Sequence, residues 1–199
     1  MRTARMFIAV GFVVSALSLG ILLLTFWPVL KVEFGYVAKQ AGIQLSITKP
    51  PKDIVPIDPD FGIVIPKLGA NAKIIPDVNP YSESAYQRAL SKGVAHARGT
   101  VYPGDVGNVF LFAHSSVDFY EALRFNSVFY LISKLEKGDE VILYHNSHKF
   151  VYIVTEKRIV SSTAVEYLSR ETKNKLLTMM TCWPPGTTLK RLVVQAELR

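Results

Sequence analysis

Three side chains that can cooperate in acyl transfer stand in or beside apolar runs of the sequence. Cys182 ends the run KLLTMMTC, His114 follows the run NVFLFA, and Arg191 lies in the run LKRLVVQAEL. A cysteine sulfur can attack a carbonyl carbon, a histidine can carry the proton, and an arginine can stabilise the charge that develops on the carbonyl oxygen. The three residues are therefore candidates for nucleophilic catalysis.

Cys182 and His114 each have a structural alternative. Cys182 is the only cysteine of the chain, so it has no partner for an internal disulfide, but a lone cysteine is often a small buried hydrophobic residue. His114 follows a continuous apolar run, which is typical of a strand buried on both faces and would place the histidine at the rim, partly desolvated yet reachable. The structural alternative is a rim histidine that only forms a hydrogen bond with a backbone carbonyl.

Strand alternation places Arg191 away from the core. Apolar residues recur with a period of two from Leu192 to Leu198 and form one face, so Arg191 points to the other face. If this strand pairs with the strand that ends at Cys182, the two residues meet near one end of the same sheet surface. A nucleophile at a strand end is held by the sheet and left open by the following loop.

The elements that must position these residues are mainly β-strands. From Phe61 onward the sequence consists of short apolar or alternating runs, separated by turn signals such as Pro103-Gly104-Asp105. Residues 82–92 are predicted to be helical, and 119–128 and 166–173 are further helix candidates. The pattern predicts a closed or nearly closed barrel with short helical insertions.

The N-terminal part predicts a membrane anchor. No charged residue occurs between positions 6 and 30. Within the predicted anchor 6–28, a helix over 6–27 would reach roughly 33 Å, enough for a bilayer core. A cleaved signal peptide is the alternative, but it would end in small residues, whereas this run ends in Phe26-Trp27-Pro28. Arginines in the tip 1–5 predict a cytoplasmic N-terminus and a single-pass protein with its folded domain, 61–199, outside the cell membrane. The proline-rich stretch 29–60 is then a stalk or linker.

The charge balance bears on the choice of partner. The formal net charge is +7, but the lysines and arginines are scattered and form no dense basic run. This scattered distribution is not typical of a nucleic-acid-binding protein, so no nucleic-acid partner is expected. An anionic membrane or wall surface is the expected neighbour.

Three segments of the chain resemble the sortase family. Thr178-Met179-Met180-Thr181-Cys182 resembles the Thr-Leu-x-Thr-Cys signature, with Arg191 following on the next strand. The segment GVAHARGTVYPGDVGNVFLFAHSS resembles the region around the family's catalytic histidine, and FGIVIPKLGANAKI resembles its first two strands. Methionine for the usual leucine at 179 is a volume-conserving change. The resemblance implies a closed eight-stranded β-barrel with short helices and an N-terminal transmembrane signal anchor.

The resemblance also implies a function. Sortases are cysteine transpeptidases that cut a Leu-Pro-x-Thr-Gly-like sorting signal of secreted proteins through a thioester and transfer the protein to an amine of peptidoglycan or of another protein. Carried onto this sequence, Cys182 is the nucleophile, His114 the acid/base and Arg191 the oxyanion partner. Thr181 and Trp183, which flank the cysteine, and His96 are further candidates for the substrate groove. For His96 a structural loop hydrogen bond is the alternative.

No metal or other cofactor is expected. Some sortases bind calcium through acidic loop residues, but the spacing of Asp105, Asp118, Asp139 and Glu140 matches no ligand pattern. His145 and His148 bracket a predicted hairpin turn and are read as turn residues, because a metal site would need further ligands.

Two other functions remain open from the residues. A cysteine peptidase or hydrolase would use the same nucleophile but release the acyl group to water. A non-catalytic wall-binding barrel would keep the fold without the reaction.

Overall fold

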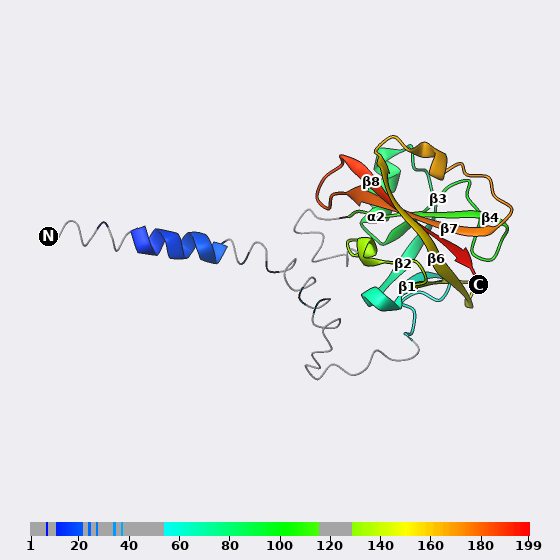
Figure 1. The fold of residues 1–199 in the computed structure, drawn as a ribbon, viewed down its shortest axis with the longest axis horizontal. Helices are drawn as coiled ribbons and strands as arrows, with labels where there is room; N and C mark the ends of the chain where they lie inside the picture. Colours follow the sequence, from blue (N-terminus) through cyan, green and yellow to red (C-terminus); the bar gives the residue numbers. More distant parts are fainter. Residues whose placement is uncertain are drawn as a thin grey trace. The chain divides into compact units, whose positions relative to one another are not determined.

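The computed structural model describes residues 54–115 and 129–199, together with residues 7, 11–21, 24, 27, 34 and 37 near the N-terminus (Figure 1). The chain divides into two compact units, Met1–Ile47 and Thr48–Arg199. In the first unit, residues 11–21 are helical. Among the described residues, no helix combines the length and apolar character needed to cross a membrane. The predicted transmembrane helix over 6–28 is therefore not supported by the structure, and part of that range lies outside the described residues.

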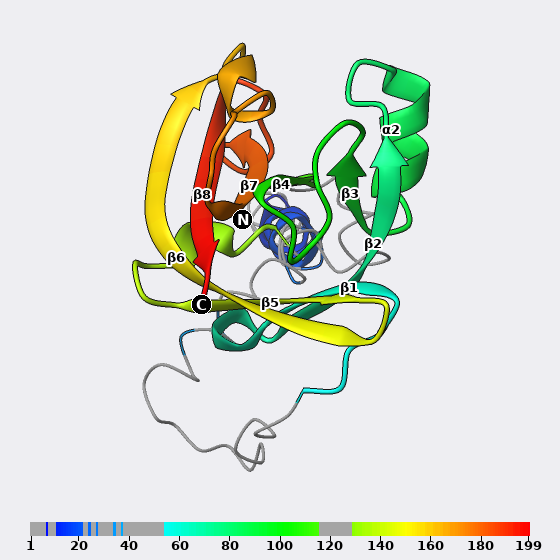
Figure 2. The same ribbon diagram turned by 90° about the vertical axis from the view of Figure 1, so that its right-hand side faces the viewer.

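The second unit is a barrel of eight strands. The circular order is β1-β2-β3-β4-β7-β8-β6-β5, and the barrel closes where β1 pairs with β5. This confirms the predicted mainly-β, closed eight-stranded barrel; the strands can be followed in Figure 2. Their bounds are β1 Phe61–Ile65, β2 Ala70–Val78, β3 Val94–Ala97, β4 Gly107–Phe112, β5 Glu140–His145, β6 His148–Ser161, β7 Lys175–Trp183 and β8 Lys190–Leu198.

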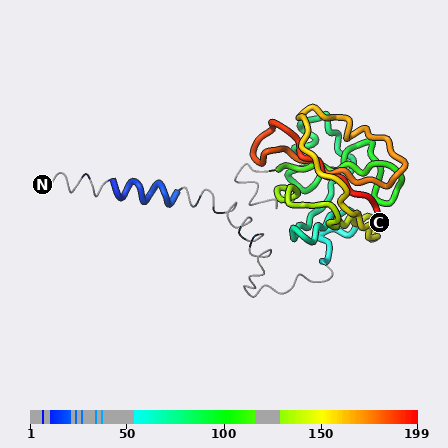
Figure 3. Tube along the Cα trace, in the orientation of Figure 1, coloured from blue at the N-terminus to red at the C-terminus, as the bar shows by residue number. Residues whose placement is uncertain are grey.

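Two of the strand pairs are parallel, and one of them determines where the candidate residues meet. β2 pairs with β3 and β4 pairs with β7 in parallel, whereas the other neighbours are antiparallel. The β4–β7 pair joins segments separated by β5 and β6 in the sequence, as the tube in Figure 3 shows. Since the two strands run in the same direction, the residues that follow β4 and those that end β7 lie at the same end of the barrel.

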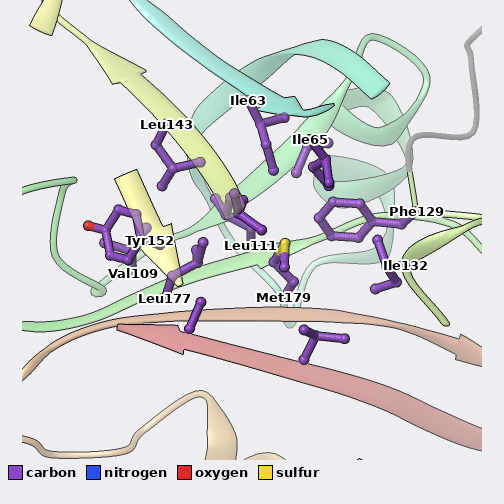
Figure 4. Close-up of a cluster of buried hydrophobic side chains, with 14 of the residues drawn as sticks. Ile63, Ile65, Val109, Leu111, Phe129, Ile132, Leu143, Tyr152, Leu177 and Met179 are labelled. Atoms are coloured by element: carbon purple, nitrogen blue, oxygen red, sulfur yellow. The ribbon is translucent and has the colours of Figure 1, made fainter. Parts of the chain in front are cut away.

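The inner face of the barrel is filled by alternate residues of the strands. Figure 4 shows part of this core, in which Leu111 from β4 and Leu177 and Met179 from β7 meet residues of β1 and β5. On β8 the inward positions are Leu192, Val194 and Ala196. The period-two pattern places the residues between them on the outer face. The sequence-based assignment of Arg191 to the non-core face of β8 therefore agrees with the structure.

The helices are short. α2, Glu83–Leu90, lies within the predicted helix 82–92 and packs on the outer face of the barrel, where Ala89 contacts a cluster that includes Ala95 and Phe112. The other described helices of this unit are 3-10 turns: η1 Pro66–Leu68, η2 Ile132–Lys134 and η3 Val165–Tyr167. The helix candidate 166–173 is therefore wrong, because polar groups of this segment bond to the sheet instead. The candidate 119–128 lies outside the described residues.

The predicted turn between His145 and His148 is a tight hairpin. These two residues pair across β5 and β6, and both central residues, Asn146 and Ser147, have positive φ angles of 49° and 64°. Positive φ at both positions matches the twist of a two-residue hairpin. His148 Nδ1 contacts the Asn146 carbonyl oxygen at 2.9 Å, so its ring serves the turn.

Candidate active site

β7 and β8 place Cys182 and Arg191 directly opposite each other. The antiparallel register pairs Thr181 with Leu192, Cys182 with Arg191 and Trp183 with Lys190. Leu192 belongs to the inner core, so the neighbouring pair Cys182 and Arg191 faces outward. Directly opposed residues have Cβ atoms about 4.5–5.5 Å apart. The thiol of Cys182 is partly exposed.

β4 brings His114 to the same rim. The parallel register ends with Phe112 beside Met180, and one further bond, from the Ala113 amide to the Met180 carbonyl at 3.2 Å, continues it. The next step of that register places His114 beside Cys182. Ala113 packs against the inner core, so alternation directs His114 outward. Three neighbouring strands thus bring His114, Cys182 and Arg191 to one end of the same outer surface.

A side chain of α2 contacts the histidine. His114 Nε2 lies 3.2 Å from Gln87 Oε1. Since an amide oxygen only accepts hydrogen bonds, this contact requires the hydrogen on Nε2. In the neutral ring Nδ1 is then unprotonated and is the nitrogen that can take a proton.

The guanidinium of Arg191 is fixed by the turn before β8. Its Nη1 donates to the carbonyl oxygens of Thr188 at 3.2 Å and Lys190 at 3.1 Å. An arginine has five N–H donors in a rigid plane, and those on Nε and Nη2 take no part in these two bonds. The turn therefore orients a cation next to the strand position of Cys182.

Thr181 and Trp183, which were expected in the groove, lie on the opposite face of β7 from Cys182. Thr181 is 3% exposed, and its Oγ1 donates to the Ala113 carbonyl oxygen at 2.8 Å. Trp183 packs against the inner core. Thr181 therefore holds the end of β4 just before His114. Neither side chain shares the outer surface with the thiol.

His96 lies inside the barrel, away from the candidate row. It is 1% exposed and packs against the rings of Phe61 and Tyr102, with centroids 5.5 and 4.8 Å away. Its Nε2 contacts the Val101 carbonyl oxygen at 3.1 Å and Thr100 Oγ1 at 3.0 Å. Burial lowers the pKa of His96 below its ordinary value of 6.5, although the Val101 carbonyl opposes this shift. The contacts of His96 are thus those of a structural histidine.

Acidic residues form no obvious cation site in the described part of the chain. No group of three or more His, Cys, Asp or Glu residues with suitable geometry is found there. Asp139 pairs with Lys67 at 2.8 Å and Glu140 with Arg199 at 2.8 Å. Asp118 lies outside the described residues.

Several polar residues near the row were not predicted from the sequence. Gln87 could not be selected because only the folding of α2 onto the barrel brings it to His114. Thr178 and Gln195 could have been predicted from strand alternation. Thr178 lies four positions before Cys182 and Gln195 four positions after Arg191, so each shares a face with that residue. Both are buried, at 0% and 4% exposure.

Comparisons with known proteins agree with this fold. The Sortase domain family model matches residues 63–199. The chain is 26% identical to Sortase D of Bacillus subtilis over 136 residues, which are 67% of this chain and 60% of that protein. It is 36% identical to Sortase A of Listeria monocytogenes over 67 residues, 34% of this chain and 30% of the relative.

Solved structures of sortases show the same fold. Sortase C-1 of Actinomyces oris superposes with a TM-score of 0.59 at 24% identity, over 86% of this chain and 85% of that one. Sortase A of Listeria monocytogenes superposes with a TM-score of 0.57 at 26% identity, over 71% of this chain and 88% of the other. With the family model matching most of the chain, this protein belongs to the sortase family.

Proposed function

We propose that this sortase is a cysteine transpeptidase that cuts a Leu-Pro-x-Thr-Gly-like signal and transfers the cut protein to an amine. The observation that carries the proposal is the arrangement of His114, Cys182 and Arg191 on neighbouring strands at one rim of the barrel. Such an arrangement supplies a nucleophile, a proton carrier and a fixed cation to a single carbonyl group. The acceptor amine belongs to peptidoglycan or to another protein.

Cys182 and His114 carry out the bond changes. The sulfur of Cys182, whose thiol proton has passed to His114, attacks the carbonyl carbon of the signal's threonine. The resulting tetrahedral intermediate collapses to a thioester as the threonine–glycine C–N bond breaks. The departing amine takes a proton from His114. In the second half, the incoming amine attacks the thioester and gives a proton to His114, and Cys182 leaves. The hydrogen bond from Nε2 to Gln87 makes Nδ1 the nitrogen that exchanges this proton.

Arg191 stabilises the charge on the carbonyl oxygen in both halves. A guanidinium stays protonated at working pH, and its planar donors suit an oxyanion better than a lysine ammonium does. The bonds from Nη1 to Thr188 and Lys190 reduce the reorganisation needed when the charge develops. Arg191 therefore acts mainly on the transition state.

We also propose that the segment 6–28 anchors the chain in the cell membrane as a single pass, with the N-terminus cytoplasmic and the barrel outside. The support is the uncharged run and the arginines at positions 2 and 5 that precede it. Secreted proteins that carry a C-terminal sorting signal are then within reach. Release of the chain from membranes by alkaline carbonate, without detergent, would contradict this anchor.

The decisive experiment follows the fate of the acyl group. The full chain in detergent is incubated with a Leu-Pro-x-Thr-Gly peptide and a glycine-based amine, and the products are identified by mass spectrometry. An amine adduct that grows with acceptor concentration supports transfer. Free acid as the sole product would identify a hydrolase. Absence of cleavage across varied signal peptides, in a folded protein, would favour a non-catalytic binding barrel.

A further inference from the structure

A buried hydroxyl group directly follows the candidate acid/base residue His114. Ser115 is only 3% exposed, yet its side chain has no hydrogen-bond partner in the described part of the chain. The other buried polar side chains described there all have a partner; they are His96, Asn108, Thr178, Thr181 and Gln195. Since most buried polar side chains are hydrogen-bonded, the exception at Ser115 requires an explanation.

Ser115 lies just beyond the last link between β4 and β7. The Ala113 amide donates to the Met180 carbonyl oxygen at 3.2 Å, and the Ala113 carbonyl oxygen accepts from Thr181 Oγ1 at 2.8 Å. The chain bends at Ser115, so the period-two rule of β4 does not extend to this residue. Because consecutive Cα atoms are about 3.8 Å apart, Ser115 shares the rim with His114.

The second half of the proposed reaction leaves one hydrogen of the attacking amine without a partner. A neutral primary amine has one lone pair and two N–H groups. The lone pair attacks the thioester carbonyl carbon and forms the new C–N bond, while one N–H proton passes to Nδ1 of His114. The C–S bond then breaks, and the sulfur of Cys182 takes that proton from His114. The second N–H stays on the nitrogen and needs an acceptor in a site shielded from water.

A serine hydroxyl has the chemistry of such an acceptor. Its oxygen carries two lone pairs and one hydrogen, and in Ser115 the described residues use none of them. The amine nitrogen becomes positive as the C–N bond forms, and a hydrogen bond from a positive donor is about twice as strong as a neutral one. A hydroxyl that is unpaired at rest and paired in the transition state lowers the barrier, because the bond is gained only during the reaction.

We propose that Ser115 determines the class of acceptor: its hydroxyl oxygen accepts a hydrogen bond from the second N–H of an attacking primary amine. The proposal rests on the transpeptidase function proposed above. Primary amines, such as the amino group of a terminal glycine or of a lysine side chain, gain this bond. A secondary amine does not, because His114 takes its single N–H proton. The enzyme therefore prefers primary amines by more than the bulk of an N-methyl group alone would cause.

The first test compares a primary with a secondary amine. The full chain in detergent receives a Leu-Pro-x-Thr-Gly peptide and either triglycine or triglycine methylated on its terminal nitrogen. Ser115→Ala should lower kcat/KM for triglycine about ten-fold and that for the methylated acceptor less than about two-fold. Ser115→Thr, which keeps the hydroxyl, should restore the preference for triglycine. The bulk of the methyl group acts in every variant and cancels in the comparison.

The second test needs no catalysis. Removing an unpaired buried hydroxyl also removes its desolvation cost, so Ser115→Ala should leave the melting temperature unchanged or raise it. Thr181→Val is the matched control, because Thr181 is equally buried at 3% but its hydroxyl bonds to the Ala113 carbonyl oxygen. Its loss leaves that oxygen unpaired and should lower the melting temperature by several degrees. An equal fall in Ser115→Ala would show that this hydroxyl is already paired at rest, and the inference would be wrong.

The kinetic outcomes separate a failure of this inference from a failure of the proposed function. If the wild type cuts the signal peptide but gives only free acid with both amines, the transpeptidase function is wrong and the inference falls with it. If the wild type transfers to triglycine and Ser115→Ala does so equally well, the function stands and only the inference is wrong. Equal losses with the two acceptors would also overturn it, because the second N–H would then make no difference.

Discussion

The inner and outer faces of β4, β7 and β8 carry different kinds of side chain although they belong to the same strands. The inner face presents apolar residues such as Leu177 and Val194, which are fully buried in the core. The outer face presents Cys182, Arg191 and the polar residues that bond to the connection 162–174 between β6 and β7. Under the proposed mechanism, alternate positions of one strand therefore serve stability and chemistry separately. Substitutions on the two faces should produce effects that separate in the same way.

The largest effect is expected from the nucleophile. Cys182→Ala should reduce transfer at least 10³-fold, because no thioester can form, and should leave the melting temperature nearly unchanged, because the thiol is partly exposed. Peptide cleavage and thermal unfolding measure the two quantities. A thioester-sized mass adduct should appear in the wild type and be absent from the variant. A large fall in melting temperature would show that this outer position is structural.

Arg191→Lys should cost about 10²-fold in kcat while KM changes little. The ammonium keeps the charge but lacks the planar donors that the oxyanion requires. Steady-state kinetics with the signal peptide checks this expectation. Lys190→Arg is a suitable control. It exchanges the same two kinds of side chain, in the reverse sense, at the neighbouring position of β8, where alternation directs the side chain to the other face. A loss of activity matched by an equal loss of stability would assign Arg191 a structural role.

Leu177→Ala should lower stability and leave activity nearly unchanged. Leu177 is fully buried on the inner face, so truncation leaves a cavity and is expected to lower the free energy of unfolding by about 2–5 kcal/mol. Activity per folded molecule should remain near the wild-type value at temperatures well below the transition. Denaturant unfolding and active-site titration separate the two. If kcat per folded molecule fell as steeply as stability, the faces would not be independent.

Gln87→Leu, a substitution on the outer surface, should have a small effect on kcat. It removes one exposed hydrogen bond to His114, worth about 1 kcal/mol, and should lower kcat about five-fold, as steady-state kinetics would measure. Arg88→Ala is the control, because Arg88 Nε bonds only within its own helix, to the Ser84 carbonyl oxygen. A kcat in Gln87→Leu equal to that of the wild type would argue against positioning of the histidine by α2.

His96, on the inner face, should make the stability of the barrel depend on pH. Burial holds the pKa of His96 below 6.5 in the folded protein, so below about pH 6.5 the unfolded chain binds a proton that the folded barrel does not. Stability should therefore fall as the pH drops below that value towards the folded pKa. His96→Gln should weaken this dependence, measured by denaturant unfolding between about pH 7.5 and pH 5. Parallel pH dependences in wild type and His96→Gln would contradict this assignment.

Much of the fold was predictable from the local sequence pattern. Period-two alternation predicted the strands and the orientation of Arg191, and the turn between His145 and His148 followed from its composition. The same rule places Thr181 and Trp183 on the other face of β7, since residues next to Cys182 on a strand must point to the opposite face.

The relation of His114 to the other two residues could not be obtained in this way. It depends on the parallel pairing of β4 with β7, which are far apart in the sequence and separated by a hairpin. No local pattern specifies such a pairing, because it results from closing the barrel as a whole. The bonds from 162–174 to the sheet were missed for the same reason.

The circular order of the strands has a consequence for crowding. A sheet edge with unpaired N–H and C=O groups can template the addition of a strand from another molecule. In this barrel each of the eight strands has a neighbour on both sides, because β1 and β5 complete the circle. Copies of this barrel can therefore collide at high concentration without offering one another a strand edge on which to aggregate.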